Sequence, residues 1–209
     1  MPKKLIIVLL GALLFFCLST GMAFAQEAPS EEPAEEPFTV YSLGQQTLSI
    51  SAGLFIPLFF QKFPGKMESG DDPYEPTNLK LGAAGSLQWS IHLSNNWITG
   101  IEISGMLSRD INDTRFFMLP ITAEAGYIIH FFPFEFPIFV GTGMNLVKLE
   151  DELNLTWIIK PGFSSIWKYN ANWGFGLNVV YWWVPQFWSD ERARMGNFLE
   201  LTLTAQYNF

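Results

Sequence analysis

The sequence predicts an all-β fold, an eight-stranded antiparallel up-and-down transmembrane β-barrel. Three observations support this prediction. Eight segments alternate apolar and polar residues with a period of two, the charged residues within them lie on the polar phase, and the chain begins with an export signal. Period-two alternation is the pattern of a β-strand, because successive side chains point to opposite faces.

Residues 1–25 have the organisation of a secretory signal peptide. Lys3 and Lys4 form a basic start, residues 5–17 are apolar, and a small-x-small cleavage site ends at Ala25. The apolar run is too short for a mature transmembrane helix. The alternative is a lipid-modified Cys17, but a bulky phenylalanine stands before it where such signals need a small residue. We therefore expect an exported chain without cysteine in its mature part, which excludes disulfides and thiol catalysis.

Residues 26–43 are predicted to be a flexible acidic leader. The stretch QEAPSEEPAEEP is rich in Pro and Glu and has no aromatic residue, so it cannot bury enough apolar surface to fold. Loss of the two signal lysines leaves 10 basic and 20 acidic residues, a mature net charge of 10 − 20 = −10. A negative chain with scattered Lys and Arg gives no reason to expect nucleic acid as a partner. Residues 44–209 are long enough for one domain, the barrel.

The predicted strands are separated by clusters of Gly, Pro, Asn and Asp. Their lengths suit a tilted strand that crosses a bilayer, which takes roughly 9–11 residues. In the final segment Leu201 and Leu203 share one phase, and Glu200 and Thr202 share the other. The strands are expected at residues 47–59, 79–93, 97–107, 117–129, 136–146, 153–167, 173–183 and 199–209.

Charged residues within the strands are predicted to point into the lumen. A soluble β-sandwich would show the same alternation with its charged face in water. In a membrane barrel the pattern is inverted, so that apolar side chains face lipid and polar ones line the lumen. The last strand must then pair with the first, because an open edge would leave backbone groups unsatisfied in hydrocarbon. The inward charged residues are Lys80, Glu102, Glu124, Lys160 and Glu200.

Aromatic residues and loop lengths favour the membrane alternative. If the first strand rises from the periplasm, many aromatic residues of the apolar phase fall at the periplasmic strand ends, as an interfacial girdle requires. Connections at that end are short, whereas residues 60–78, 108–116 and 184–195 form longer connections at the outer end. The predicted girdle is Trp89, Trp97, Tyr127, Phe136, Trp167, Trp173, Tyr207 and Phe209.

Several short motifs are typical of a known group of barrels. They are LPI at residues 119–121, AGY at 125–127 and the Gly-rich PIFVGTG at 137–143. In these the chain resembles the small eight-stranded outer-membrane barrels of didermic bacteria, the group of the outer-membrane protein A transmembrane domain and the protein X and W types. Terminal Phe209, with Tyr207 two positions before it, is similar to the signal that the barrel-assembly machinery recognises. The resemblance implies a bacterial outer-membrane location.

The lumen contains two candidate functional regions. An eight-stranded barrel is just wide enough to be filled by side chains, so a general diffusion pore is not expected. The charged residues are expected to form a structural polar network or, alternatively, an ion or proton path. Apolar inward residues near the outer mouth either pack together or line a pocket for a small apolar molecule. These residues are Phe55, Met106, Phe116, Met118, Trp182 and Phe198.

No enzymatic or metal site is expected, and no cofactor. Histidine-dependent hydrolysis of outer-leaflet lipids would need a histidine near the outer surface. His92 and His130 instead fall at periplasmic strand ends, where we expect them to lie in water. The scattered carboxylates do not have the spacing of metal ligands.

The function expected from the sequence is therefore non-enzymatic. The chain would be a structural or surface-exposed barrel, and the resemblance to the protein W type implies limited passage of small hydrophobic molecules. The alternative is an adhesion or binding module acting through outer loops, such as residues 61–78 and the exposed Phe187 and Trp188. The expected partners are the lipid bilayer, the barrel-assembly machinery, and a small hydrophobic solute or host ligand.

Overall fold

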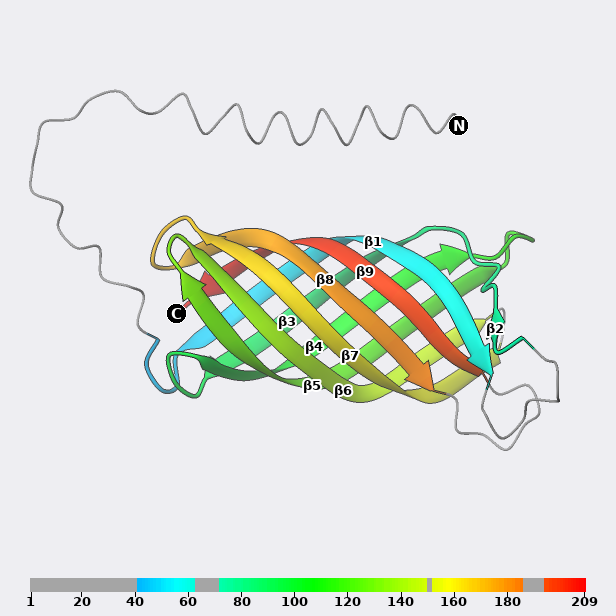
Figure 1. Cartoon of the computed structure of the whole chain (residues 1–209), viewed down its shortest axis with the longest axis horizontal. Coiled ribbons are helices and arrows are strands. Elements are labelled where there is room, and N and C mark those ends of the chain that lie inside the picture. The colour runs from blue at the N-terminus through cyan, green and yellow to red at the C-terminus, as the bar shows by residue number, and fades with distance from the viewer. Residues whose placement is uncertain (1–40, 63–71, 150–151, 186–193) are drawn as a thin grey trace, which may run out of the picture. The chain divides into compact units, whose positions relative to one another are not determined.

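The computed structural model describes residues 41–62, 72–149, 152–185 and 194–209, which form a closed antiparallel β-barrel (Figure 1). Eight long strands follow one another in chain order, and β1 pairs with β9 to close the barrel. The short strand β2 adds only to one end of β1. This confirms the predicted fold class. The strands are β1 (Gln46–Lys62), β2 (Tyr74–Glu75), β3 (Gly82–His92), β4 (Trp97–Arg109), β5 (Arg115–Phe131), β6 (Phe134–Leu149), β7 (Glu152–Lys168), β8 (Trp173–Pro185) and β9 (Arg194–Asn208).

The two ends of the barrel differ in their connections. At one end, residues 93–96, 132–133 and 169–172 form short turns. The barrel also begins and ends there, because the Phe209 N–H donates to the Gln46 carbonyl at 3.0 Å. We call this the inner end. The opposite, outer end carries the longer connections that follow β1 and β8.

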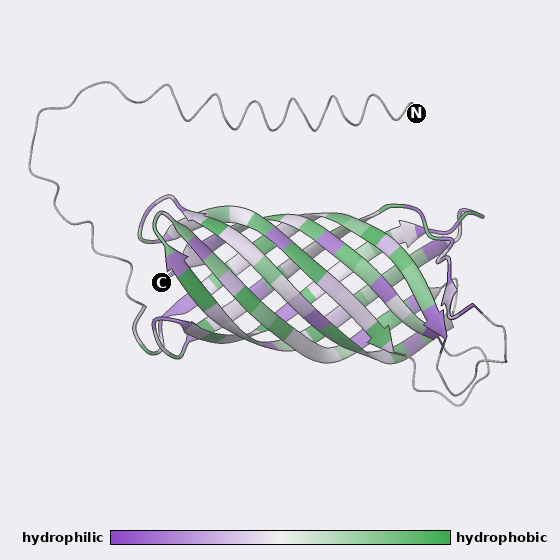
Figure 2. Ribbon diagram, in the orientation of Figure 1, coloured by the Kyte–Doolittle hydropathy of each residue, from purple (hydrophilic) through white to green (hydrophobic). Residues whose placement is uncertain are grey.

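The outer surface of the barrel is apolar, and its lumen is mostly polar. Along β9, Leu201 and Leu203 are 38% and 67% exposed, whereas the intervening Thr202 is 1% exposed. The same alternation runs along the other strands (Figure 2). A continuous apolar surface of this size is unfavourable in water and is favourable against hydrocarbon. No helix among the described residues is long and apolar enough to cross a membrane.

Aromatic rings gather on this surface at the inner end. Trp97 meets Tyr127 edge to face with ring centroids 5.3 Å apart. Trp173 lies 5.0 Å from Tyr207, which in turn stacks on Phe209 at 6.2 Å. These rings come from β4, β5, β8 and β9, so they follow the wall of the barrel around its inner edge. Amphipathic rings are placed in this way at a boundary between lipid and water.

The strand ends differ from those predicted, mainly at the outer end. β9 begins at Arg194 instead of residue 199, and β1 continues to Lys62. A β-bulge between Pro57 and Phe59 shifts the register of β1 against β9. A bulge changes the phase of the side chains, so simple alternation stops before the strand does. In contrast, β3 begins only at Gly82, three residues after the predicted start at residue 79.

Candidate functional site in the barrel interior

Three layers of side chains fill the lumen. From the inner to the outer end, we call them the inner-end cluster (Tyr41, His92, His130, Glu135 and Lys168), the ion cluster (Glu102, Glu124, Lys160 and Glu200) and the outer apolar cluster around Phe55, Trp182 and Phe198. Each layer is built from several strands, because inward residues at one depth lie side by side across the ladders.

Tyr41 is the centre of the inner-end cluster, although it lies before β1 in the chain. Its side chain is 3% exposed, and its ring stacks on His92 with centroids 3.8 Å apart. The Tyr41 hydroxyl donates to Glu135 Oε2 at 2.8 Å and accepts from Lys168 Nζ at 2.6 Å. Burial raises the pKa of the Tyr41 phenol, and the Glu135 carboxylate raises it further. The phenol therefore stays protonated and links the carboxylate to the ammonium group.

Both histidines belong to this cluster, so the prediction that they lie in water is wrong. His92 is 1% exposed, and His130 Nδ1 lies 3.4 Å from Glu135 Oε1. The Thr47 hydroxyl donates to Asn208 at 2.7 Å, so it accepts the proton of His92 Nε2 at 3.0 Å. His92 Nδ1 has no hydrogen-bond partner within the described chain.

Part of this cluster could have been predicted from the alternation of the strands. Glu135, Lys168 and both histidines lie on the inward phase of strands that flank short turns. That phase places their side chains inside the barrel wall and not in the solvent around the turn. Tyr41 had no such signal, because it belongs to a segment predicted to be flexible.

The ion cluster is held by one fully buried ammonium group. Lys160 donates to Glu102 and to Ser104 Oγ, the latter at 2.9 Å, and its Nζ lies 3.9 Å from Glu200 Oε2. The ammonium also lies over the Trp182 ring, 4.5 Å from the centroid. The indole N–H of Trp182 donates to Glu200 at 2.8 Å. Lys160 is thus paired with two carboxylates and an aromatic face, as a buried charge requires.

Glu124 completes the ion cluster, and Lys80 does not belong to it. Gln88 Nε2 donates to Glu124 Oε2 at 2.5 Å, whereas Glu124 Oε1 has no partner among the described residues. The prediction that Lys80 points into the lumen is wrong. Because β3 begins at Gly82, Lys80 lies on the outer rim, where its ammonium contacts Asp113 Oδ1 at 2.6 Å. The cluster therefore contains three carboxyl groups and one lysine.

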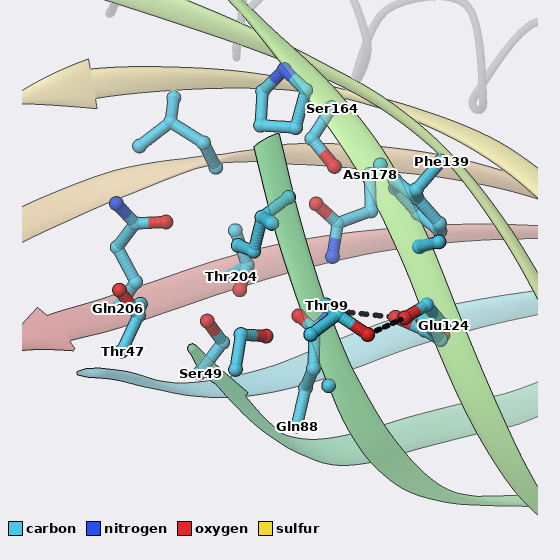
Figure 3. Close-up of a pocket in the computed structure, with 17 residues that line it drawn as sticks. Thr47, Ser49, Gln88, Thr99, Glu124, Phe139, Ser164, Asn178, Thr204 and Gln206 are labelled. Carbon is cyan, nitrogen blue, oxygen red and sulfur yellow. Dashed lines mark hydrogen bonds between the residues drawn. The ribbon is translucent and has the colours of Figure 1, made fainter. Parts of the chain in front are cut away.

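A small cavity with polar and apolar walls lies between the ion cluster and the inner end. Its volume is about 50 Å³, and Thr47 of the inner end and Glu124 of the ion cluster both contribute to its wall. Figure 3 shows the hydroxyl and amide side chains around it, including Ser49, Asn178 and Thr204. Because one water needs on the order of 10–15 Å³ of such space, the cavity can hold only a few waters.

The outer apolar cluster brings together all six residues of the predicted apolar pocket. Phe55 lies 5.0 Å from Phe198 and 5.6 Å from Trp182, measured between ring centroids. Phe116 lies 6.5 Å from Phe198. All are buried and belong to one packed cluster. The cluster comprises Phe55, Ala84, Met106, Phe116, Met118, Ile158, Val180, Trp182, Val184 and Phe198.

The remaining candidates carry no site within the described part of the chain. There, no group of three or more His, Asp or Glu residues could hold a metal ion. His92 and His130 both lie at the inner end, away from the outer rim. Phe187, Trp188 and residues 63–71, which are half of the predicted loop at residues 61–78, lie outside the described residues.

Comparison with known proteins by sequence finds a family model and a relative. A protein-family model matches residues 27–207, so the chain belongs to that family. An uncharacterized protein of Borreliella burgdorferi is 27% identical over 184 residues, which cover 78% of this chain and 82% of the relative.

Two solved structures have the same fold at low identity. Neisserial surface protein A has a TM-score of 0.56 at 11% identity, covering 79% of this chain and 97% of that one. The outer membrane protein OprG of Pseudomonas aeruginosa has a TM-score of 0.51 at 11% identity, covering 82% and 99%. They confirm the resemblance to small eight-stranded outer-membrane barrels.

Proposed function

We propose that the protein is a non-enzymatic bacterial outer-membrane barrel with a closed lumen, which serves as a structural scaffold for the surface it presents. The observation that carries this proposal is the succession of three filled layers along the lumen. The predicted export signal and the apolar outer surface support the location. The comparisons support the fold on which the proposal rests.

The contacts within the layers explain why the lumen would stay closed. A solute or ion that crosses the middle layer must separate Lys160 from Glu102 and Glu200. Breaking a buried ion pair of this kind costs about 3–5 kcal/mol, because each group is left charged without a partner. The same solute would also have to displace the packed rings of Phe55 and Phe198. Both barriers lie in series along the same path.

The passage of small hydrophobic molecules receives no support from this geometry. It would need an apolar space below the outer mouth, and the six residues expected to line one contact each other or share one packed cluster. Binding through the outer loops is compatible with a closed barrel, since it requires only a rigid support. Its main candidate residues lie outside the described ranges.

The closing strand supports recognition of Tyr207 and Phe209 by the barrel-assembly machinery, which we include in the proposal. Tyr207 and Phe209 lie on the outward phase at the inner end of β9, 37% and 57% exposed. Both rings are therefore accessible at the periplasmic edge in the proposed orientation. A machinery that recognises the last strand from that side could contact them before β9 pairs with β1.

Reconstitution of the mature chain tests the closed lumen. In planar bilayers we expect no stepwise conductance, and in vesicles no uptake of small polar or apolar solutes. A variant with Tyr41→Gly, Glu102→Ala, Lys160→Ala, Phe55→Ala and Phe198→Ala removes side chains from all three layers and should raise the conductance above background. Leu203→Ala, which trims only a lipid-facing side chain, is the matched control. Steady single-channel conductance or solute uptake by the wild-type chain would contradict the proposal.

A further inference from the structure

The outer rim contains an open recess that the filled lumen does not use. It has a volume of about 490 Å³ and lies where β3 begins and β4 ends. The start of β5 contributes Arg115 to its wall. The recess lies on the lipid-facing side of the barrel and is separate from the three interior layers.

The floor of the recess is apolar, and several positions along it have small side chains or none. Leu81 and Leu107 are 61% and 58% exposed, and Ala83 lies directly opposite Leu107 in the β3–β4 ladder. Further toward the middle of the barrel, Gly85 is paired with Gly105 on the same outward phase. Neither glycine has a side chain, so the low surface continues from the rim along the barrel wall. An extended hydrocarbon chain fits a surface of this shape and polarity.

The rim of the recess is basic. Arg109 and Arg115 are direct partners in the β4–β5 ladder, and both are exposed on the outward phase. Two like charges placed opposite each other are unfavourable unless an anion lies between them. Neither arginine forms a salt bridge with a carboxylate among the described residues, although Arg109 is near enough to Asp113 to help lower the pKa of that carboxyl. The nearby acids are already engaged, since Asp113 binds Lys80 at 2.6 Å and Asp110 accepts the backbone N–H groups of a turn.

We propose that this recess binds the phosphate headgroup of an outer-leaflet lipid, with the phosphate at Arg109 and Arg115 and an acyl chain along the floor. Guanidinium groups match phosphate oxygens with two parallel hydrogen bonds, and Lys80, which is paired with Asp113, lies beside them. The basic rim stands at the outer edge of the apolar surface, which is the level of the headgroups in a bilayer. The inference rests on the proposed membrane location but not on the closed lumen.

Lipid titration of the folded mature chain tests this site. The chain is held in neutral detergent micelles and titrated with dioleoyl phosphatidic acid or dioleoyl phosphatidylcholine, and bound lipid is counted by native mass spectrometry. We expect phosphatidic acid to bind at least about tenfold more tightly, because its phosphate is not neutralised by a choline group and can pair with both guanidinium groups. The double variant Arg109→Gln/Arg115→Gln should lose most of this preference.

A second pair of basic residues provides the matched control. Lys62 and Arg194 also lie at the outer end, on β1 and β9, where both contact Glu75. The variant Lys62→Gln/Arg194→Gln removes the same charge and should keep the preference for phosphatidic acid. Equal losses in the two double variants would overturn the site, because the binding would then follow net charge alone. Folding of every variant is checked by its heat-dependent gel mobility. Lys80→Gln, at the same rim, should reduce the preference for phosphatidic acid less than the double arginine variant does.

Two further arms separate a lipid site from a simple anion site. Ala83→Phe places a ring on the floor while the basic rim stays intact, and it should weaken phosphatidic acid about tenfold. Inorganic phosphate at millimolar concentration should compete only weakly, because it lacks the acyl chain. Full competition by inorganic phosphate, or no effect of Ala83→Phe, would overturn the lipid assignment. Lipid binding is measured in micelles, whereas conductance and insertion are measured in bilayers. Absence of lipid binding would therefore overturn only this site, whereas conductance or failed insertion would contradict the proposed function.

Discussion

The inner and outer halves of the lumen are filled by different physical means. The inner half contains buried ionic and polar groups that need specific partners, such as Glu135 with Tyr41 and Lys168. The outer half contains Phe, Trp, Met and aliphatic side chains that need only contact. Both halves lie in the same barrel and are enclosed by the same lipid-facing surface.

This difference explains where the lumen is imperfectly packed. The polar half contains the cavity of about 50 Å³ and the buried atoms His92 Nδ1 and Glu124 Oε1, which have no hydrogen-bond partner among the described residues. Hydrogen bonds have preferred directions, so a polar interior cannot satisfy every atom and also fill all space. Apolar side chains have no such restriction and pack closely. The polar half should therefore depend on single groups, and the apolar half on total volume.

The largest effect is expected from the ion cluster. Lys160→Met removes the one ammonium group and leaves Glu102, Glu124 and Glu200 together without a cation. We expect a loss of about 3–5 kcal/mol in the free energy of unfolding, since uncompensated buried charges are strongly unfavourable. Urea unfolding in detergent, followed by tryptophan fluorescence, measures it. Lys80→Met is the control, because this lysine is exposed at the rim. An equal loss of stability in this control would show that the loss follows the net charge of the chain and not the burial of Lys160.

A smaller but still large effect is expected in the outer apolar cluster. Phe55→Ala leaves a cavity between Trp182 and Phe198 and should cost about 3 kcal/mol by the same unfolding measurement. Phe55→Leu keeps most of the volume and should cost less than half as much, because apolar interiors tolerate volume-conserving changes. Equal losses for the two variants would contradict the idea that volume determines stability in this half.

The inner-end cluster offers a test that depends on pH. Tyr41→Phe keeps the ring on His92 but removes the hydroxyl between Glu135 and Lys168, and should cost about 1–2 kcal/mol near neutral pH. The Tyr41 pKa is raised above its usual 10.0 in the folded chain. This contribution is therefore fully present below about pH 10 and is lost as the pH rises further, when the phenol of the unfolded chain ionises. The difference between wild type and Tyr41→Phe should shrink above that pH; a constant difference would contradict the buried neutral phenol.

The smallest effect is expected at the outer rim, where the charges are in water. The hydrogen bond from Lys80 lowers the pKa of Asp113 below its usual value of 3.8. Lys80→Gln should return that pKa toward 3.8, as measured by NMR titration of the Asp113 carboxyl. Stability should remain nearly unchanged, because exposed ion pairs contribute little. A large loss of stability would mean that Lys80 has an interior role.

The fold, and the position of most inward residues along the barrel axis, could be predicted from the sequence. Alternation assigns the phase of Glu102 and Lys160, and closure of the barrel then brings residues 58 positions apart into an ion pair. Lys80 was misplaced because β3 begins at Gly82, three residues after the predicted start, and alternation does not mark a strand end. Tyr41 was missed because its position depends on side chains of four strands, β3, β5, β6 and β7, that surround it. A packed apolar cluster and an apolar pocket have the same sequence pattern, so only side-chain geometry separates them.

The central claim is that apolar side chains of the barrel face lipid and polar side chains face the lumen. Magnetic resonance in lipid nanodiscs tests this arrangement directly. The structure predicts close contacts between lipid acyl protons and the side chains of Leu201 and Leu203, and none with Glu200, Thr202 or Thr204. Cross-relaxation of the acyl chains with Leu201 and Leu203, and not with Glu200, Thr202 or Thr204, would support this arrangement. Cross-relaxation with both phases, or free exposure of Glu200 and Lys160 to water, would contradict it.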